Sequence, residues 1–247
     1  MKKFVFTIIF LIVNINLGAD EIIDSSSFLD ITKPIIGKNK YVFDNKNIKI
    51  QVPKFADNSL QVPIYIDASK IMNAKRMLIL ADYNPIPIII DMDIKEIRPV
   101  FSTNIKVANE TPLRILVLDD KNIWHVNNAL IKSLGGGCDV SSLASKDKSF
   151  AKKLGITKGK IFIKKNNNNK RIKASIFHPM ETGLIFGSLE FYIERITIQD
   201  SNKILSTIKT TSAISENPRF IFEINKKVKN LNIHFFDNEG NDFKLEL

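Results

Sequence analysis

The chain contains a single cysteine, Cys138, which directly follows three glycines, Gly135, Gly136 and Gly137. A single thiol cannot form an internal disulfide, so it either pairs with another molecule or reacts with one. Glycine leaves the backbone free and offers no side chain that would shield the neighbouring sulfur. A structural cysteine, by contrast, usually lies inside an apolar strand or helix. The pattern therefore predicts an exposed, functional thiol at Cys138, on a flexible loop formed by the glycines.

The three histidines do not form a recognisable catalytic or metal-binding motif. His125 and His234 lie in strand-like runs, where a surface or hydrogen-bonded histidine is usual, and His178 ends a strand in a compact turn. A Cys–His nucleophile pair would indicate a hydrolase, but no oxyanion-hole motif accompanies it. A blue-copper site needs two histidines, a cysteine and a methionine at tight spacing, whereas Cys138 precedes His178 by 40 residues. We therefore expect no catalytic residue, metal or cofactor, with a Cys–His hydrolase as an open alternative.

A thiol without activating neighbours is a weak nucleophile. Its pKa is about 8.5, so only a few per cent of it is thiolate at neutral pH. A partner enzyme could activate such a thiol inside its own pocket. The residues therefore favour a carrier arm, in which a substrate bonded to Cys138 visits separate enzymes and the carrier itself is not an enzyme. An exposed thiol also permits a disulfide dimer of two chains through Cys138.

The amino terminus has the pattern of a secretory signal peptide. Two lysines precede an apolar run from Phe4 to Val13, and Leu17-Gly18-Ala19 forms a small-residue cleavage site. The run is too short to span a membrane, and the residue directly after the cleavage site is Asp20 and not a cysteine that could carry a lipid anchor. We therefore expect residues 1–19 to be removed and the mature protein to be periplasmic, without a membrane anchor.

The composition is basic but does not require a nucleic-acid partner. The formal net charge is +10, and about +8 once the two lysines of the leader are removed. A basic surface suits anionic small molecules, acidic proteins or nucleic acid. Lysine, asparagine and isoleucine are frequent throughout the chain, however, so a general compositional bias explains the charge. Because the protein is expected to be exported and carries no nucleic-acid-binding motif, we expect no nucleic-acid partner.

Residues 20–138 have the pattern of a β-sandwich domain. Short runs rich in Val, Ile and Phe alternate with clusters of Pro, Asn and Asp, without helical periodicity between them. Such runs at regular spacing predict an antiparallel sandwich. One helix or two short ones are expected within residues 21–36. The predicted strands are Ile48–Val52, Val62–Ile66, Met77–Leu80, Ile86–Asp91, Phe101–Val107, Leu113–Leu118 and Trp124–Ile131.

Residues 139–169 lose the strand pattern. Ten lysines and arginines and a single aspartate lie between Lys146 and Arg171, and such a composition cannot bury much apolar area. The segment is predicted to be a flexible basic linker, within which Ile161-Phe162-Ile163 could form a short strand. The strand pattern then resumes and predicts a second sandwich over residues 170–247. Its expected strands are Ile172–Phe177, Leu189–Ile198, Ile204–Ile208, Arg219–Ile224, Leu231–Phe236 and Asp242–Leu245, with a hairpin turn at Asp237-Asn238-Glu239-Gly240.

Both halves of the chain contain further motifs. The first half contains Val52-Pro53-Lys54-Phe55-Ala56-Asp57-Asn58, Val62-Pro63-Ile64 and Asn84-Pro85-Ile86-Pro87, followed by the glycine-cysteine tip. The second half contains His178-Pro179-Met180-Glu181-Thr182-Gly183, Ser215-Glu216-Asn217-Pro218 and the turn at residues 237–240. These motifs resemble those of the sulfur carrier of the thiosulfate-oxidising Sox pathway (SoxYZ), with its Y and Z subunits fused in one chain. The resemblance covers about residues 40–138 and 170–247.

The resemblance implies a fold, a function and partners. The fold is two immunoglobulin-like antiparallel β-sandwich domains, SoxY-like over residues 20–138 and SoxZ-like over residues 170–247, joined by the linker. The implied function is covalent attachment of reduced sulfur species to Cys138. The implied partners are periplasmic sulfur-oxidising enzymes of the haem, metal-dependent hydrolase and molybdenum types.

One alternative and one departure from the family pattern stay open. The alternative is a non-catalytic β-sandwich interaction module of a periplasmic quinoprotein dehydrogenase system, in which Cys138 is not used as a carrier. The departure is the position of the thiol. The cysteine of a separate Y subunit lies beside the carboxyl terminus, whereas here the chain continues through Asp139-Val140. A partner would therefore have to accept a loop in place of a free arm.

Overall fold

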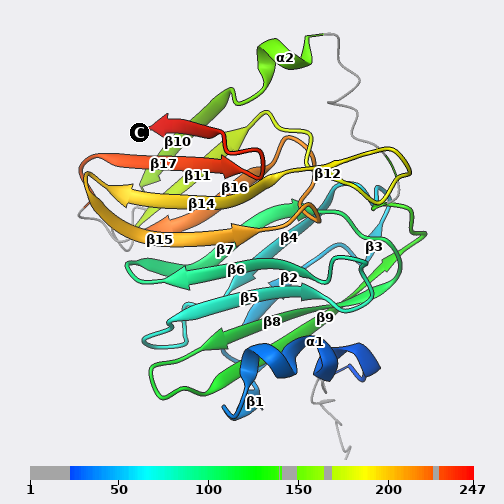
Figure 1. Cartoon of the computed structure of the whole chain (residues 1–247). Coiled ribbons are helices and arrows are strands. Elements are labelled where there is room, and N and C mark those ends of the chain that lie inside the picture. Colours follow the sequence, from blue (N-terminus) through cyan, green and yellow to red (C-terminus); the bar gives the residue numbers. More distant parts are fainter. Residues whose placement is uncertain (1–22, 139, 141–148, 164–168, 225–227) are drawn as a thin grey trace, which may run out of the picture.

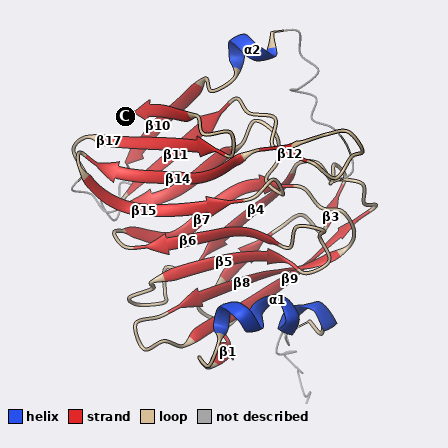
Figure 2. Ribbon diagram, viewed as in Figure 1, coloured by secondary structure: helices blue, strands red, loops and turns tan. Residues whose placement is uncertain are grey.

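The computed structural model describes residues 23–138, 140, 149–163, 169–224 and 228–247. The expected signal peptide, residues 1–19, lies outside this part of the chain. Strands dominate the described residues, as Figure 2 shows, and most pairs of neighbouring strands are antiparallel. The expected all-β class is confirmed. No helix in the described part has the length and apolar character needed to cross a membrane.

The first half contains a helix followed by strands β1 to β9. The helix α1 (Ser26–Ile36) lies within the segment where one was expected. All predicted strands of this half are confirmed, although β1 and β3 were not expected because each is very short. The strands are β1 (Tyr41–Phe43), β2 (Lys49–Gln51), β3 (Phe55–Ala56), β4 (Val62–Asp67), β5 (Arg76–Ala81), β6 (Ile88–Ile94), β7 (Ile97–Ile105), β8 (Thr111–Leu118) and β9 (Trp124–Ser133).

The second half begins with a short helix, α2 (Phe150–Lys153), and continues with strands β10 to β18. Its predicted strands are also confirmed, except that the one expected over Leu189–Ile198 is divided into β13 and β14, which belong to different sheets. The turn between the last two strands is built as expected. There the Asp237 carboxylate accepts the backbone N–H groups of Glu239 and Asn241. The strands are β10 (Thr157–Ile163), β11 (Lys170–Ile176), β12 (Glu181–Thr182), β13 (Glu190–Phe191), β14 (Ile193–Asp200), β15 (Lys203–Thr210), β16 (Arg219–Ile224), β17 (Leu231–Asp237) and β18 (Asp242–Glu246).

Both main sheets run through both halves of the chain. The larger sheet has the order β1-β9-β8-β5-β6-β15-β14-β17-β18, and the smaller has the order β10-β11-β16-β7-β4-β2. The first half therefore joins the second through β6 with β15 in one sheet and through β7 with β16 in the other. Figure 1 shows β6 and β15 side by side, with β7 in the layer behind them. We call this double junction the seam; there the strand edges of each half are paired rather than left open.

Residues 157–163, which were expected to belong to a flexible linker, instead form the edge strand β10. This strand pairs with β11 over its whole length, from Thr157 opposite Ile176 to Ile163 opposite Lys170. Most of its side chains are exposed. As an edge strand, β10 is paired along one side only, with β11. The short strand considered at Ile161-Phe162-Ile163 is therefore present and begins earlier, at Thr157, whereas the composition of the segment had predicted a linker. The rest of the expected linker lies mainly at residues 139, 141–148 and 164–168, outside the described residues.

The core lies between the two sheets and continues across the seam. Inward-facing side chains alternate along the strands, as in β4, where Val62, Ile64 and Ile66 are buried. Residues of both halves belong to this one cluster; Phe101 of β7, for example, contacts Phe220 of β16. Burial of apolar area stabilises a protein by about 25 cal/mol per Å². The shared core therefore stabilises the two halves as one unit, and it fixes the geometry around Cys138.

Candidate functional site

Cys138 lies at the seam and is fully buried, with 0% of its surface exposed. The expectation of an exposed thiol is wrong for this arrangement of the chain. After β9, residues 135–138, which we call the arm, turn back against the segment that follows β7. A glycine run lets two backbone segments approach closely, and here that close approach covers the sulfur.

Hydrogen bonds hold the arm on the first half of the chain. The Gly136 N–H donates to the Ala108 carbonyl at 2.9 Å, and the Gly137 N–H donates to the Val107 carbonyl at 3.1 Å. The Ser59 hydroxyl donates to the Gly135 carbonyl at 2.7 Å. The arm is therefore docked along its whole length before it reaches Cys138.

Glycine is required at residues 135–137 of the arm for steric reasons that the sequence alone did not reveal. Gly135 and Gly136 have φ values of +90° and +82°, which side-chain-bearing residues rarely adopt. A Cβ atom on Gly137 would lie 2.2 Å from the Ser59 carbonyl oxygen and 2.5 Å from the Val107 carbonyl oxygen. The docked arm thus needs glycine for its turn and for close packing. Flexibility of the loop at these residues stays a prediction.

The second half of the chain completes the enclosure of Cys138. The Thr182 hydroxyl donates to the Cys138 carbonyl at 3.0 Å. Two residues before Thr182, the Met180 carbonyl accepts a hydrogen bond from the Lys106 ammonium, and the Ser212 carbonyl accepts another at 3.1 Å. The His-Pro-Met-Glu-Thr-Gly motif therefore contacts both the arm and Lys106.

The other motifs meet at the same place. The Asn84 side chain donates to the Lys106 carbonyl and accepts the Ala108 N–H, so it clamps the segment on which the arm docks. The Ser215 hydroxyl donates to the Leu60 carbonyl, next to Ser59. The Asn217 N–H donates to the His178 carbonyl and so joins the two motifs of the second half. Motifs that are far apart in sequence thus surround one thiol.

Lys106 is the residue at this site that the sequence analysis missed. It is 4% exposed, and burial lowers its pKa to about 8. The signal was present, since Lys106 lies between the apolar residues Ile105 and Val107 of a predicted strand, and lysine is almost never fully buried unless it is paired. It was overlooked because the chain is rich in lysine everywhere.

His178 is the most perturbed histidine of the chain. It is fully buried; its Nδ1 accepts the Met180 N–H, and its Nε2 lies 3.6 Å from the Asp237 carboxylate. The pKa of His178 is lowered to about 4, mainly by burial and to a smaller extent by the Lys106 charge, and attraction to Asp237 opposes this shift. His178 is therefore neutral in the native protein at neutral pH, and it supports the motif turn that carries Met180.

The pKa of His178 predicts an acid-sensitive fold. Between its ordinary value of about 6.5 and about 4, the unfolded chain binds a proton that the native protein does not. The free energy of unfolding should therefore fall as the pH decreases through this window, by about 3 kcal/mol for this group, and level off below it. Urea unfolding over this pH range should show a steeper fall in wild-type protein than in His178→Gln. Parallel curves for the two proteins would contradict this role.

The other two histidines are hydrogen-bonded, as expected. His125 contacts the Asp44 carboxylate at 2.7 Å, and His234 contacts Asp242 at 3.0 Å and Gln199 at 2.8 Å. Within the described residues, no group of three or more histidine, cysteine, aspartate or glutamate side chains is placed to hold a metal ion.

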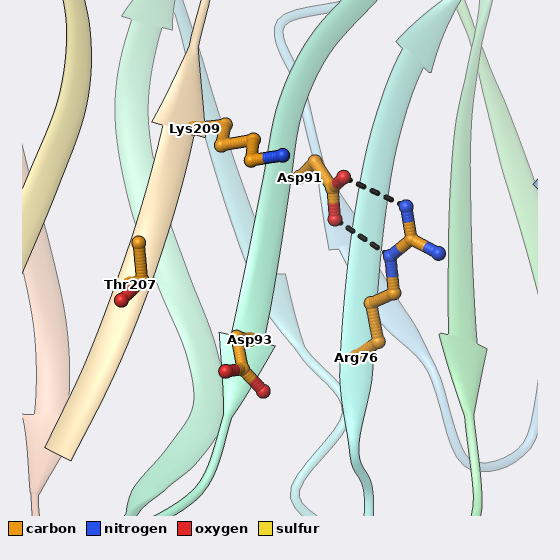
Figure 3. A pocket seen from close by; sticks show the side chains of 5 residues that line it. All are labelled: Arg76, Asp91, Asp93, Thr207 and Lys209. Carbon is orange, nitrogen blue, oxygen red and sulfur yellow. Dashed lines mark hydrogen bonds and ion pairs between the residues drawn. The ribbon is translucent and has the colours of Figure 1, made fainter. Parts of the chain in front are cut away.

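A surface hollow crosses the seam on the larger sheet (Figure 3). Arg76 of β5 donates to both carboxylate oxygens of Asp91 on β6, each at 2.7 Å. Asp93 of β6 and Thr207 and Lys209 of β15 complete its lining. Its two basic and two acidic side chains balance in charge, and Arg76 is already engaged. We assign the hollow to the pairing of the sheet and not to chemistry.

Comparison with known proteins divides the chain at the arm. Residues 32–138 match the family model for the sulfur oxidation protein SoxY, and residues 161–247 match the model for the sulphur oxidation protein SoxZ. No curated protein matches the chain. Among solved structures, the sulfur carrier protein SoxY from Chlorobium limicola f thiosulfatophilum aligns with 43% of this chain and 91% of its own, at 21% identity and a TM-score of 0.40.

Proposed function

Because the chain belongs to the SoxY and SoxZ families, with a domain of each in one polypeptide, we propose that it carries sulfur-oxidation intermediates bonded covalently to Cys138. The observation that supports this most is the placement of the only thiol. It ends an arm that both halves hold, through Ser59 on one side and Thr182 on the other. Thr182 of the His-Pro-Met-Glu-Thr-Gly motif contacts this arm, and Asn84 and Ser215 of two other motifs bond to the segments beside it.

The carrier needs partner enzymes for its chemistry. Joining the Cys138 thiolate to a second sulfur anion forms a sulfur–sulfur bond and removes two electrons. Because the chain has a single cysteine, it has no internal disulfide that could accept these two electrons. We assign their removal to a partner of the haem type, and release or further oxidation of the cargo to partners of the hydrolase and molybdenum types. These partners and the carrier would meet in the periplasm.

The buried position of the thiol gives the carrier two states. A thiol reacts only where a reagent can reach its sulfur. In the docked state Cys138 is enclosed, so an oxidant or a foreign thiol does not reach it. Each hydrogen bond that holds the arm contributes about 1 kcal/mol net. In this proposal the arm leaves the seam when a partner enzyme offers its own pocket.

A radiolabel experiment tests the proposal. Purified protein with labelled thiosulfate alone should neither consume it nor become labelled. Addition of a periplasmic extract should place label on the protein that survives denaturation and is released by a thiol reductant. Turnover by the purified protein alone would favour the Cys–His hydrolase. Persistent absence of covalent label would favour the interaction module.

A further inference from the structure

Lys106 is buried although nothing in the sheet requires a charge there. Among the described residues it is the only buried lysine, and it directly follows the strand β7. Its ammonium donates to the Met180 and Ser212 carbonyls. Two neutral carbonyls do not neutralise a buried positive charge, which is costly unless a negative group faces it. The burial of Lys106 therefore requires an anion nearby.

The pairing of the arm places Cys138 next to Lys106. Gly136 bonds to Ala108 and Gly137 bonds to Val107, so the two segments run antiparallel, one residue at a time. Cys138 comes next after Gly137 on the arm and Lys106 comes next before Val107 on the other segment, so this register brings the two residues near each other. Both residues are also attached to the same short stretch of the second half, Cys138 through Thr182 and Lys106 through Met180.

The charges around Lys106 agree with this placement. Burial lowers the pKa of Lys106 to about 8, and attraction to the anionic forms of Cys138, Glu181 and Glu216 opposes this, with Cys138 first. His178 also faces Lys106, but it is neutral at neutral pH, and Asp237 lies beyond it. Lys106 is therefore still mainly protonated at neutral pH. In its anionic form, the Cys138 sulfur raises the pKa of Lys106 more than either carboxylate does.

We propose that Lys106 is the charge partner of the sulfur on Cys138, and that the seam retains the arm when this sulfur, or the group bonded to it, is an anion. Lys106 is a positioning residue in this role and takes part in no bond change. A thiolate, a persulfide or an adduct that ends in a sulfonate is anionic and would stay docked. A neutral adduct would leave the ammonium without its main partner and favour release of the arm. The part concerning sulfur cargo rests on the proposed function; the pairing of Lys106 with Cys138 does not.

Two nearly isosteric adducts test the pairing in otherwise wild-type protein. Cys138 is alkylated in mild denaturant with iodoacetate, which leaves an anionic group, or with iodoacetamide, which leaves a neutral one, and the protein is refolded. The anionic adduct should melt higher than the neutral one at pH 7, by about 4 °C or more, as expected for a charge-assisted contact in a chain of this size. Equal midpoints, or a higher midpoint for the neutral adduct, would overturn the proposal.

Variants of Lys106 show whether the difference depends on its charge. Lys106→Met should abolish the difference between the two adducts, whereas Lys106→Arg should keep most of it. Lys170→Met is the matched control, because the Lys170 ammonium also donates to a backbone carbonyl, that of Val228. It should leave the difference unchanged. If Lys106→Met does not fold, the wild-type pair and Lys106→Arg still decide the matter.

The outcome is independent of the carrier hypothesis. The alkylated proteins contain no sulfur cargo and need no partner enzyme. A failure of the adduct experiment would remove the role of Lys106 and leave covalent sulfur carriage to be judged by the radiolabel. Absence of label together with a clear difference between the adducts would remove covalent sulfur carriage and leave the role of Lys106 in place.

Discussion

Replacing Cys138 with serine is expected to abolish the sulfur oxidation that depends on this protein, while the protein still folds and accumulates. The change substitutes one oxygen for one sulfur at a buried position, so the packing of the arm is nearly conserved. A serine hydroxyl, however, forms no sulfur–sulfur bond. Cells that carry Cys138→Ser as their only copy should consume thiosulfate at the rate of a strain that lacks the protein.

The matched control for this variant is Met72→Ser, which removes a sulfur-containing side chain at a position that is 80% exposed. It should leave thiosulfate consumption unchanged. Wild-type consumption by Cys138→Ser cells would mean that the thiol is not the carrier group, and the interaction-module hypothesis would then be preferred. Loss of the protein itself, checked by immunoblot, would point to a folding effect instead.

Replacing Asp82 with alanine is expected to cause the largest loss of stability. Arg114 is fully buried beneath α1, paired with the Asp82 carboxylate at 2.8 Å and set over the Phe28 ring at 4.5 Å. Removal of Asp82 leaves a guanidinium charge buried without its partner, which costs about 3–5 kcal/mol. The midpoint of urea unfolding should fall accordingly, with little change in the denaturant dependence.

An exposed ion pair provides the contrast for this prediction. Glu96 contacts the Lys203 ammonium at 2.6 Å, but both side chains are largely in solvent. Glu96→Ala should therefore lower the free energy of unfolding by no more than about 1 kcal/mol. If Asp82→Ala costs as little as Glu96→Ala, the buried pair of Asp82 and Arg114 does not stabilise the fold.

The strands could be predicted from sequence because their signal is local. Val62, Ile64 and Ile66 alternate with side chains that face outward, and turn residues mark the ends of such runs. Only the end of β10, Ile161-Phe162-Ile163, was considered as a strand, because an edge strand that faces solvent has the composition of a linker. The merging of the two halves into shared sheets could not be predicted, since pairing of β6 with β15 depends on contacts more than 100 residues apart.

The motifs of the site could be found, but their arrangement could not. The sequence pointed to Cys138, to its glycines and to the turn that begins at His178. It suggested an exposed thiol, because glycine signals both flexibility and close packing, and only the neighbouring carbonyls of Ser59 and Val107 tell the two apart. Lys106 was hidden among many other lysines, and its burial follows only from the meeting of the two halves.

The central claim, that Cys138 holds sulfur intermediates covalently, is tested most directly by intact-mass analysis of the protein isolated from cells that are oxidising reduced sulfur. The account predicts a mass above that of the processed chain, which a thiol reductant returns to the unmodified value. Digestion should place the added mass on the peptide that contains Cys138, and Cys138→Ser protein from the same cells should lack it. An unmodified, reductant-insensitive wild-type mass under these conditions would contradict the claim.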